Sequence, residues 1–296
     1  MKFPLLKYFA KPHIRRRLWR ERLTEPIHLN LVAAAVALFG STRTKIDYGC
    51  IPMQHYAFGL AKASEIAIEC GLPGITVIEF GVAAGRGLMN LYSICELLKR
   101  ETGLEYSIVG FDSGRGMPSP VDFRDHPDLY STGDFPMNVP LLQNNLPSNV
   151  QLLLGDVSRT VEPFLNDFSG MYPIGFISFD LDYYSSTISA LEILTDSNAE
   201  KYLPRVPVYF DDISEESHNP WAGEQLAIKE FNERSGSRKL AQIEFIQNNR
   251  IFKNAWWLRQ MYFMHVLDYN LKGSLGDDVS RKRTIENPYL SQNLQW

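Results

Sequence analysis

Cysteine and long apolar segments are both scarce in this sequence. The chain of 296 residues has three cysteines, Cys50, Cys70 and Cys95, and no CxxC pair. This number and spacing argue against a disulfide framework and against a zinc site built from cysteines, and they favour a reducing compartment. The longest apolar run, residues 31–39, is far shorter than the ~20 residues that a membrane-spanning helix needs.

Strong compositional bias is also absent. Hydrophobic residues make up 45% of the chain and charged residues 22%, and the sequence has no internal repeat or low-complexity segment. Collagen-like, disordered and disulfide-scaffold classes are therefore excluded, and the length fits one large α/β domain with extensions. The basic stretch before the apolar run is too long for a signal peptide and is interrupted by Glu21 and Glu25, so we expect a cytoplasmic protein.

Charge is spread unevenly along the chain. Residues 1–25 contain eight basic and two acidic residues and so carry +6; because the net charge is −4, the remainder carries −10. A basic arm on an acidic body is typical of peripheral contact with an anionic membrane surface or with an acidic partner. The alternative is an N-terminal helix that packs its apolar face on a neighbouring subunit of a homo-oligomer. We expect no nucleic-acid partner.

Five short apolar runs predict buried strands. They are rich in β-branched and aromatic residues, lack polar alternation, and are separated by helix-like segments at 88–100, 186–194 and 224–232. This alternation predicts a doubly wound parallel sheet whose strands are covered on both faces. The runs lie at 76–82, 106–112, 150–156, 174–182 and 206–213.

The complete prediction is a Rossmann-like α/β fold with a mostly parallel sheet of seven strands. Two further candidate strands, 243–246 and 261–267, have no strong helix between them and are expected to form an antiparallel edge. Residues 113–149 are polar and rich in proline and glycine, which predicts an excursion or lid near the strand ends. A basic helical extension, a main domain and a C-terminal tail are expected over 1–44, 45–270 and 271–296.

The first run ends in a glycine-rich turn. Its sequence from Glu79 to Gly87 is EFGVAAGRG, and glycines allow a backbone to approach a ligand closely and to turn into the next helix. The spacing of Gly81 and Gly85 differs from the dinucleotide fingerprint, because Asn90 stands where a third glycine is required. An acid two positions before the first glycine fits an amino-acid-bearing nucleoside better than a pyrophosphate. A tight turn without a ligand is the alternative.

The second and third runs also end in acids. Asp112 is followed by Ser113, and an acid at this position is placed to accept hydrogen bonds from both hydroxyls of a ribose. Asp156 is followed by Val157, where the acid and the backbone amides after it could contact an adenine edge. Because aspartate often caps helices and starts turns, a purely structural role is the alternative for each of them.

Four carboxylates follow the last two runs. Asp180 and Asp182 lie on one side of an extended chain, and Asp211 and Asp212 are adjacent. Carboxylates gathered at neighbouring strand ends repel one another unless a cation lies among them, and an all-oxygen set suits Mg²⁺. Capping of the two following helices is the alternative.

Together these segments resemble the class I S-adenosylmethionine-dependent methyltransferases, specifically the macrocin O-methyltransferase family of metal-dependent sugar methyltransferases. The resemblance covers about residues 45–231 and rests on EFGVAAGRG, FDSGRGMP, DLDYYSST and YFDD. It departs from the family at Gly114, where an aromatic residue is frequent. The family pattern D-x-D-x-Y-x-S-T is matched by Asp180, Asp182, Tyr184, Ser186 and Thr187.

The resemblance implies an S-adenosylmethionine site, a Mg²⁺ site and a general base, Asp182. His218, just past the YFDD segment, is a competing base on a predicted loop. The implied metal ligands are Asp180, Asp211 and Asp212. The implied cofactor-binding residues are Glu79, Gly81, Gly85, Asp112, Ser113, Asp156, Val157 and Asp180.

The implied reaction is methyl transfer to a hydroxyl of a vicinal diol on a sugar of a glycoside or glycan. A divalent cation that chelates two neighbouring oxygens would both orient the diol and favour its ionisation. Two alternatives stay open. One is the same chemistry on a catechol, and the other is a catalytically silent binding or scaffold protein that uses the basic arm.

Overall fold

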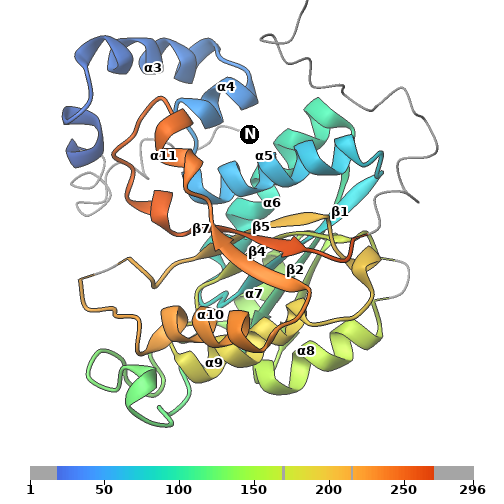
Figure 1. Cartoon of the computed structure of the whole chain (residues 1–296). Coiled ribbons are helices and arrows are strands. Elements are labelled where there is room, and N and C mark those ends of the chain that lie inside the picture. Colours follow the sequence, from blue (N-terminus) through green and yellow to red (C-terminus); the bar gives the residue numbers. More distant parts are fainter. Residues whose placement is uncertain (1–18, 169–170, 215, 270–296) are drawn as a thin grey trace, which may run out of the picture.

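The computed structural model describes residues 19–168, 171–214 and 216–269, and these form a mixed sheet between two layers of helices (Figure 1). The sheet has seven strands in the order β3-β2-β1-β4-β5-β7-β6. The predicted Rossmann-like α/β class is therefore confirmed. Most of the basic arm and the predicted tail lie outside the described residues. The strands are β1 (Gly74–Phe80), β2 (Glu105–Asp112), β3 (Val150–Leu154), β4 (Ile174–Phe179), β5 (Arg205–Phe210), β6 (Arg238–Gln242) and β7 (Met261–Val266).

The first five strands are parallel, and β7 and β6 complete the sheet as an antiparallel edge. Every residue of β1 and β4 is buried, which explains why their sequences are continuous apolar runs. The strand predicted at 243–246 is wrong. β6 ends before it, and two residues of this segment are buried without forming a strand: Ile243 lies between β6 and helix α11 (Phe245–Asn249), and Ile246 lies in α11.

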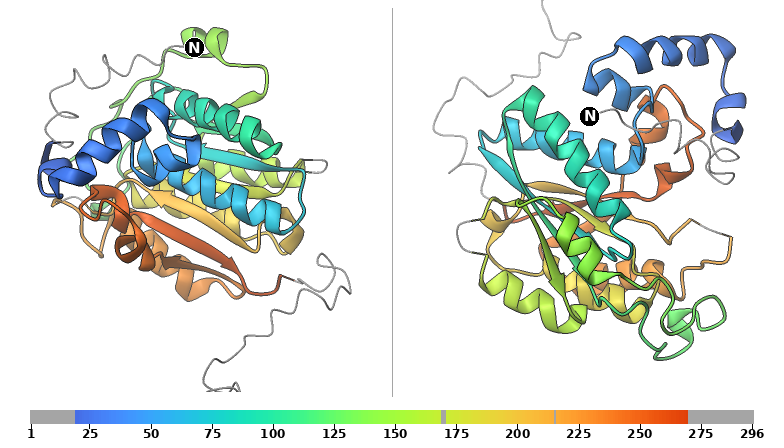
Figure 2. Two further views of the ribbon diagram at one scale, coloured as in Figure 1. Left: turned by 90° about the horizontal axis from the view of Figure 1, so that it is seen from above. Right: turned by 180° about the vertical axis from the view of Figure 1, so that it is seen from behind.

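Helices cover both faces of the sheet (Figures 1 and 2). Helices α5 and α6 pack on one face, and α8, α9 and α10 pack on the other. The helix-like segments predicted from the sequence all lie in these layers. The bounds are α5 (Gln54–Glu69), α6 (Arg86–Thr102), α8 (Val157–Asn166), α9 (Tyr184–Ala190), which continues as η2 (Leu191–Leu194), and α10 (Gly223–Arg234).

Shorter elements lie outside the two layers. Two helices of the N-terminal extension, α3 (Ile27–Phe39) and α4 (Thr42–Asp47), precede the sheet. The predicted excursion 113–149 connects β2 to β3 and contains only η1 (Phe123–Asp125) and α7 (Val139–Asn145) as regular elements. The remaining 3-10 turns are η3 (Ala199–Lys201) and η4 (Trp256–Arg259).

The chain order places the ends of β1 and β4 side by side. β1 lies between β2 and β4, so the sheet reverses its direction of growth there, and ligands bind at such a switch point in open α/β sheets. Gly81 follows β1 with φ +83°, and a Cβ at this position would overlap the backbone carbonyl of Asp180. The glycine therefore permits both the turn and the close contact between the two strand ends.

We expect Gly81→Ala to destabilise the protein more than Gly103→Ala. Gly103 also has positive φ, +75°, but open space surrounds its Cβ position, so alanine there costs only the backbone penalty of about 1–2 kcal/mol. Alanine at Gly81 adds overpacking against Asp180, typically another 1–3 kcal/mol. Chemical denaturation of both variants measures the difference, and equal losses would contradict the close contact.

Candidate active site at the strand ends

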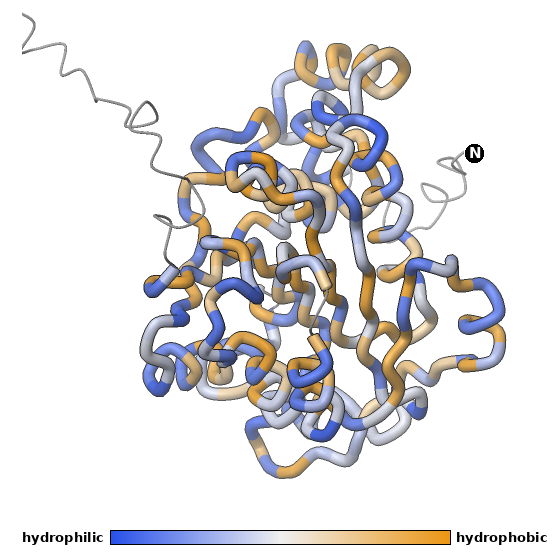
Figure 3. Tube along the Cα trace, turned by 90° about the vertical axis from the view of Figure 1, so that its right-hand side faces the viewer, coloured by the Kyte–Doolittle hydropathy of each residue, from blue (hydrophilic) through white to orange (hydrophobic). Residues whose placement is uncertain are grey.

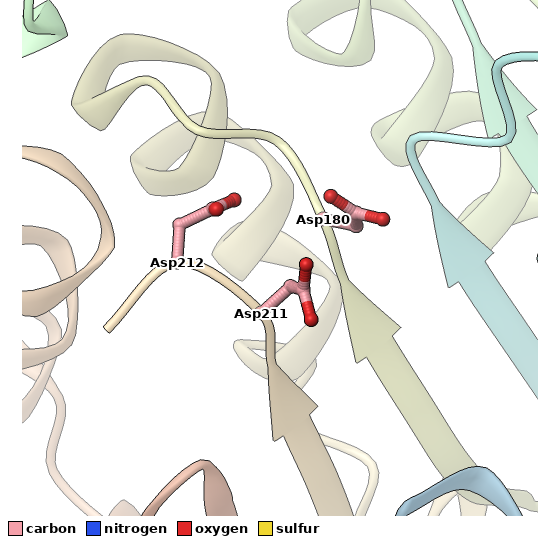
Figure 4. A group of neighbouring side chains, drawn as sticks. All are labelled: Asp180, Asp211 and Asp212. Atoms are coloured by element: carbon pink, nitrogen blue, oxygen red, sulfur yellow. The ribbon is translucent and has the colours of Figure 1, made fainter. Parts of the chain in front are cut away.

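Three carboxylates meet where β4 and β5 end. Asp180 follows β4, and Asp211 and Asp212 follow β5 (Figure 4). One oxygen from each of the three lies within 4.8 Å of the other two, and Asp212 is buried while the other two are half-buried. Among the described residues, this is the one group of three or more acidic, histidine or cysteine side chains with such geometry. The donors are all carboxylate oxygens, which suits a hard cation such as Mg²⁺.

Burial and mutual repulsion favour protonation of this cluster. Burial and then the charges of Asp211 and Asp182 raise the pKa of Asp180 well above its usual value. Burial and then Asp182 and Glu224 raise the pKa of Asp212 in the same way. A divalent cation would oppose both effects, because it attracts the ionised form. The three carboxylates could hold such a cation, and none of them is the N-cap of α9 or α10, where Tyr183 and Ala222 stand.

Neighbouring side chains hold the acids in place. The Tyr209 hydroxyl donates a hydrogen bond to Oδ1 of Asp211, and the Gln260 amide donates to the Asp211 carbonyl. Glu224, fully buried at the start of α10, accepts from the backbone amide of Asp212 at 3.0 Å and from that of Leu181 at 3.4 Å. One carboxylate thus links both acidic strand ends. Glu224 was not among the residues predicted from the sequence, because its contacts with the backbone amides of other segments leave no residue pattern.

Of the two candidate bases, Asp182 lies beside this cluster and His218 lies near His126. Asp182 has positive φ, +58°, in the turn from β4 to α9. The ring of His218 is 5.2 Å from that of His126, and a Cβ on Gly223 would meet both Nε2 of His126 and the carbonyl of Asp182. The structure therefore brings both predicted bases to one region, with His126 close to each. Nε2 of His126 is buried and has no hydrogen-bond partner in the described part of the chain.

The excursion 113–149 is anchored to this region by one buried carboxylate. Asp125 accepts hydrogen bonds from the backbone amide and the hydroxyl of Ser185, both at 2.8 Å, at the N-terminal end of α9. It also accepts from the amide of Val121 at 2.8 Å. Its neighbour His126 is thereby fixed beside Gly223. No sequence signal distinguished Asp125 or His126 from other polar loop residues.

A second buried carboxylate, Glu79, lies at the end of β1. It accepts a 2.8 Å hydrogen bond at Oε1 from the Tyr56 hydroxyl, which in turn accepts one from Ser178. Burial raises the pKa of Glu79 to about 8, although the hydrogen bond from Tyr56 acts in the opposite direction. Its Oε2 is buried without a partner among the described residues. The unused oxygen fits a cationic donor such as the ammonium group of S-adenosylmethionine.

The glycine-rich turn is packed closely around Glu79. A Cβ on Gly87 would overlap the Glu79 carboxylate, and a Cβ on Gly85 would overlap the side chain of Leu142 in α7. Asp112, at the end of β2, accepts from the amides of Ala83 at 2.8 Å and Gly114 at 2.6 Å. The structure thus brings the predicted cofactor residues of β1 and β2 together.

The remaining predicted cofactor residues have structural partners as well. Asp156 is exposed and caps α8 by accepting from the amide of Ser158 at 2.9 Å. The hydrogen bond from the Ser158 hydroxyl, and then that from its amide, lower the pKa of Asp156. Val157 is the first residue of α8 and is buried. The Ser113 hydroxyl donates to the carbonyl of Gly116 at 2.8 Å. These contacts leave the proposed adenine and ribose roles as predictions.

Comparisons with known proteins give structural likeness at low identity. No protein-family profile and no curated protein matches the chain. CalS11, a calicheamicin methyltransferase, is 21% identical with a TM-score of 0.49 over 86% of this chain and 93% of its own. The O-methyltransferase NovP is 16% identical with a TM-score of 0.47 over 72% and 79%. The plantazolicin methyltransferase BpumL in complex with SAH is 11% identical, with a TM-score of 0.35 over 91% and 87%.

The acidic cluster predicts that Mg²⁺ stabilises the protein more at high pH. The pKa values of Glu79, Asp180 and Asp212 are raised on folding, so the stability that they contribute is complete below about pH 4 and is lost as pH rises. In EDTA, the melting temperature should therefore fall between about pH 5 and pH 8. Each tenfold difference in proton affinity between the folded and the unfolded state changes the free energy of unfolding by about 1.4 kcal/mol. Saturating Mg²⁺ at 100 times its Kd should restore about 2.7 kcal/mol.

Paired variants test whether this Mg²⁺ effect arises at the cluster. Asp211→Asn combined with Asp212→Asn should abolish it, whereas Asp167→Asn, at an exposed acid after α8, should leave it unchanged. The readout is thermal unfolding, followed by circular dichroism at about pH 5 and at about pH 8. An equal Mg²⁺ effect in the double variant and the control would show that the cation binds elsewhere.

Proposed function

We propose that this chain is an S-adenosylmethionine- and Mg²⁺-dependent O-methyltransferase that acts on a vicinal diol of a sugar. The observation that carries the proposal is the direct packing of Gly81, in the turn proposed to hold the methyl donor, against the backbone of Asp180 in the acidic cluster. This contact makes the two proposed binding sites immediate neighbours. Methyl transfer is an in-line displacement and requires that adjacency.

The proposed roles of the chain's residues follow from their environment. Glu79 would accept from the ammonium group of the methyl donor through its unused oxygen, and Asp112 would receive the ribose hydroxyls on its remaining lone pairs. Asp180, Asp211 and Asp212 would hold the cation. When bound, the two groups supply an activated methyl and a positive charge that favours ionisation of a nearby hydroxyl.

The proton of the acceptor hydroxyl has two candidate destinations. Asp182 is next to the cluster, and its charge is felt by Asp180 and Asp212. His218 is further along the β5–α10 loop, in contact with His126. We favour Asp182 because it lies in the turn after β4, two residues beyond Asp180, where the acceptor oxygen would be held between the cation and the methyl donor.

The acceptor is proposed to lie between the excursion 113–149 and the loop that joins β5 to α10. Trp221 in that loop is 66% exposed, and although Lys229 lies over its ring at 4.9 Å, the exposed part of the ring offers a face for a sugar. Tyr184 does not, because its side chain is buried and its hydroxyl donates to Glu230 at 2.5 Å. A catechol is the alternative acceptor, and parallel assays with sugar diols and catechols separate the two.

Cofactor binding and metal binding should be separable by mutation. Calorimetric titration with S-adenosylhomocysteine should show micromolar affinity both in Mg²⁺ and in EDTA. Glu79→Gln should weaken this affinity by about 10–100-fold, since it removes a charge-assisted hydrogen bond, and should leave Mg²⁺ binding intact. Asp211→Asn with Asp212→Asn should do the reverse. Absence of S-adenosylhomocysteine binding under both conditions would refute the methyltransferase proposal.

The base is identified by turnover with an accepted diol. Asp182→Asn should lower kcat by about 10²–10⁴-fold while the affinity for S-adenosylhomocysteine stays unchanged, because a general base acts only in the chemical step. His218→Gln should have a much smaller effect. The opposite ranking of the two variants would make His218 the base. Turnover that persists unchanged in EDTA would contradict the role of the metal.

A further inference from the structure

Two tyrosine hydroxyls lie in the apolar interior beside the proposed site. Tyr56, on α5, and Tyr209, on β5, are each 1% exposed and belong to the hydrophobic core of the protein. Figure 3 shows that hydrophobic segments of the chain run through the middle of the molecule. A buried hydroxyl costs about 1–3 kcal/mol unless it has a hydrogen-bond partner, a cost that phenylalanine avoids. The partners of the two hydroxyls therefore decide whether these residues do more than fill the core.

Each hydroxyl donates to one carboxylate of the proposed site. The Tyr56 hydroxyl donates to Oε1 of Glu79 at 2.8 Å, at the end of β1. The Tyr209 hydroxyl donates to Oδ1 of Asp211, directly after β5. A phenol is neutral near pH 7, so each hydroxyl meets its carboxylate as a donor. Because Glu79 is proposed to bind the methyl donor and Asp211 the cation, one tyrosine contacts each half of the site.

A second hydrogen-bond partner orients each hydroxyl. Tyr56 accepts from the Ser178 hydroxyl at 2.9 Å, which leaves its own proton for the carboxylate. The Tyr209 hydroxyl also lies 3.2 Å from Oε1 of Gln260, whose amide nitrogen donates to the Asp211 carbonyl. A phenol has a single proton, and the contact of Tyr209 with the Asp211 carboxylate is the shorter of the two. Both hydroxyls are thus directed at the acids.

The rings of the two tyrosines pack against each other and against one histidine. The two ring centroids are 5.7 Å apart, with an interplanar angle of 79°. The ring of His55, the residue before Tyr56 in α5, is stacked on Tyr209 at 4.3 Å and meets Tyr56 edge-on at 4.7 Å. All three rings are buried, so none can turn aside without displacing the others. The first turn of α5 therefore holds both hydroxyls in place.

We propose that Tyr56 and Tyr209 are positioning residues for the proposed methyl transfer. Tyr56 holds Glu79 in the orientation that binds the methyl donor, and Tyr209 holds Asp211 in the orientation that binds the cation. This inference rests on the proposed function and adds that each half of the site has its own buried hydroxyl. Both tyrosines act through a carboxylate, because their rings lie in the core.

Removing one hydroxyl at a time separates the two roles. Tyr209→Phe should weaken Mg²⁺ binding by about 10–100-fold, the usual effect of losing an outer partner of a metal ligand, and should leave S-adenosylhomocysteine affinity unchanged. Tyr56→Phe should leave Mg²⁺ binding unchanged and weaken S-adenosylhomocysteine binding by about three- to tenfold. The reason is that burial raises the pKa of Glu79 and the Tyr56 hydrogen bond opposes this rise, which keeps more of the carboxylate ionised.

Ser178→Ala provides a second, milder variant. It removes the donor to Tyr56 and leaves the tyrosine ring in place, so it should weaken S-adenosylhomocysteine binding in the same direction but less than Tyr56→Phe. Calorimetric titrations of the full chain with Mg²⁺ and with S-adenosylhomocysteine measure both affinities for every variant.

The matched control is Tyr202→Phe. Tyr202 is also fully buried, and its hydroxyl donates to the Ile193 carbonyl at 2.8 Å, just before β5 and at the end of that strand away from the acids. This variant should change neither affinity, and thermal unfolding of all variants compares their losses of stability.

Two results would overturn the inference. One is Mg²⁺ binding by Tyr209→Phe that is as tight as that by Tyr202→Phe. The other is an equal loss of both affinities in Tyr56→Phe and in Tyr209→Phe, because general loosening of the core would then explain the effects. An unaltered chain that binds neither ligand would refute the proposed function itself, and this inference with it.

Discussion

The contact between Gly81 and the Asp180 backbone is the constraint on which the proposed site depends. It sets the separation of two neighbouring parallel strands where both end, and no side chain larger than hydrogen fits between them. The glycine-rich turn is fixed on one side of this contact and the acidic cluster on the other. Because backbone atoms define the distance between the two strand ends, the glycine-rich turn and the acidic cluster are both held by a rigid sheet whose central strands β1 and β4 are fully buried.

Around this contact the protein concentrates negative charge that folding alone does not stabilise. Glu79, Asp180, Asp212 and Glu224 are all buried acids with raised pKa values, and burial is the first cause for each. Glu79 accepts from the Tyr56 hydroxyl and Glu224 from backbone amides, and such partners orient a carboxylate without neutralising it. Such an arrangement has a physical rationale if cations complete it: an ammonium group at Glu79 and a divalent ion at the cluster.

Much of this arrangement could be predicted from the sequence, because the sequence pattern marks where each buried strand ends. Buried parallel strands appear as apolar runs, and the acids that follow them must meet at one edge of the sheet, so Asp112, Asp180 and Asp211 could be grouped without coordinates. Glu224 and Asp125 were not predicted, because each acts through backbone amides of a distant segment and this role gives no residue pattern in the sequence. The position of β6 was not predicted, because an edge strand buries few side chains and so shows no apolar run. Only Arg238 and Leu240 of its five residues are buried.

The excursion between β2 and β3 contacts both the glycine-rich turn and the region of Asp182. It could therefore determine which acceptor binds without containing the residues proposed for methyl transfer. Its α7 places Leu142 on the Gly85 turn, and its Asp125 caps α9 beside Asp182, so the segment spans from the proposed methyl donor to the proposed base. None of the strand-end acids belongs to it. Changes within the excursion can therefore alter which acceptor fits while the carboxylates and the glycine turn stay in place. His126, fixed on this segment beside Gly223, is the point at which acceptor recognition and proton transfer would meet.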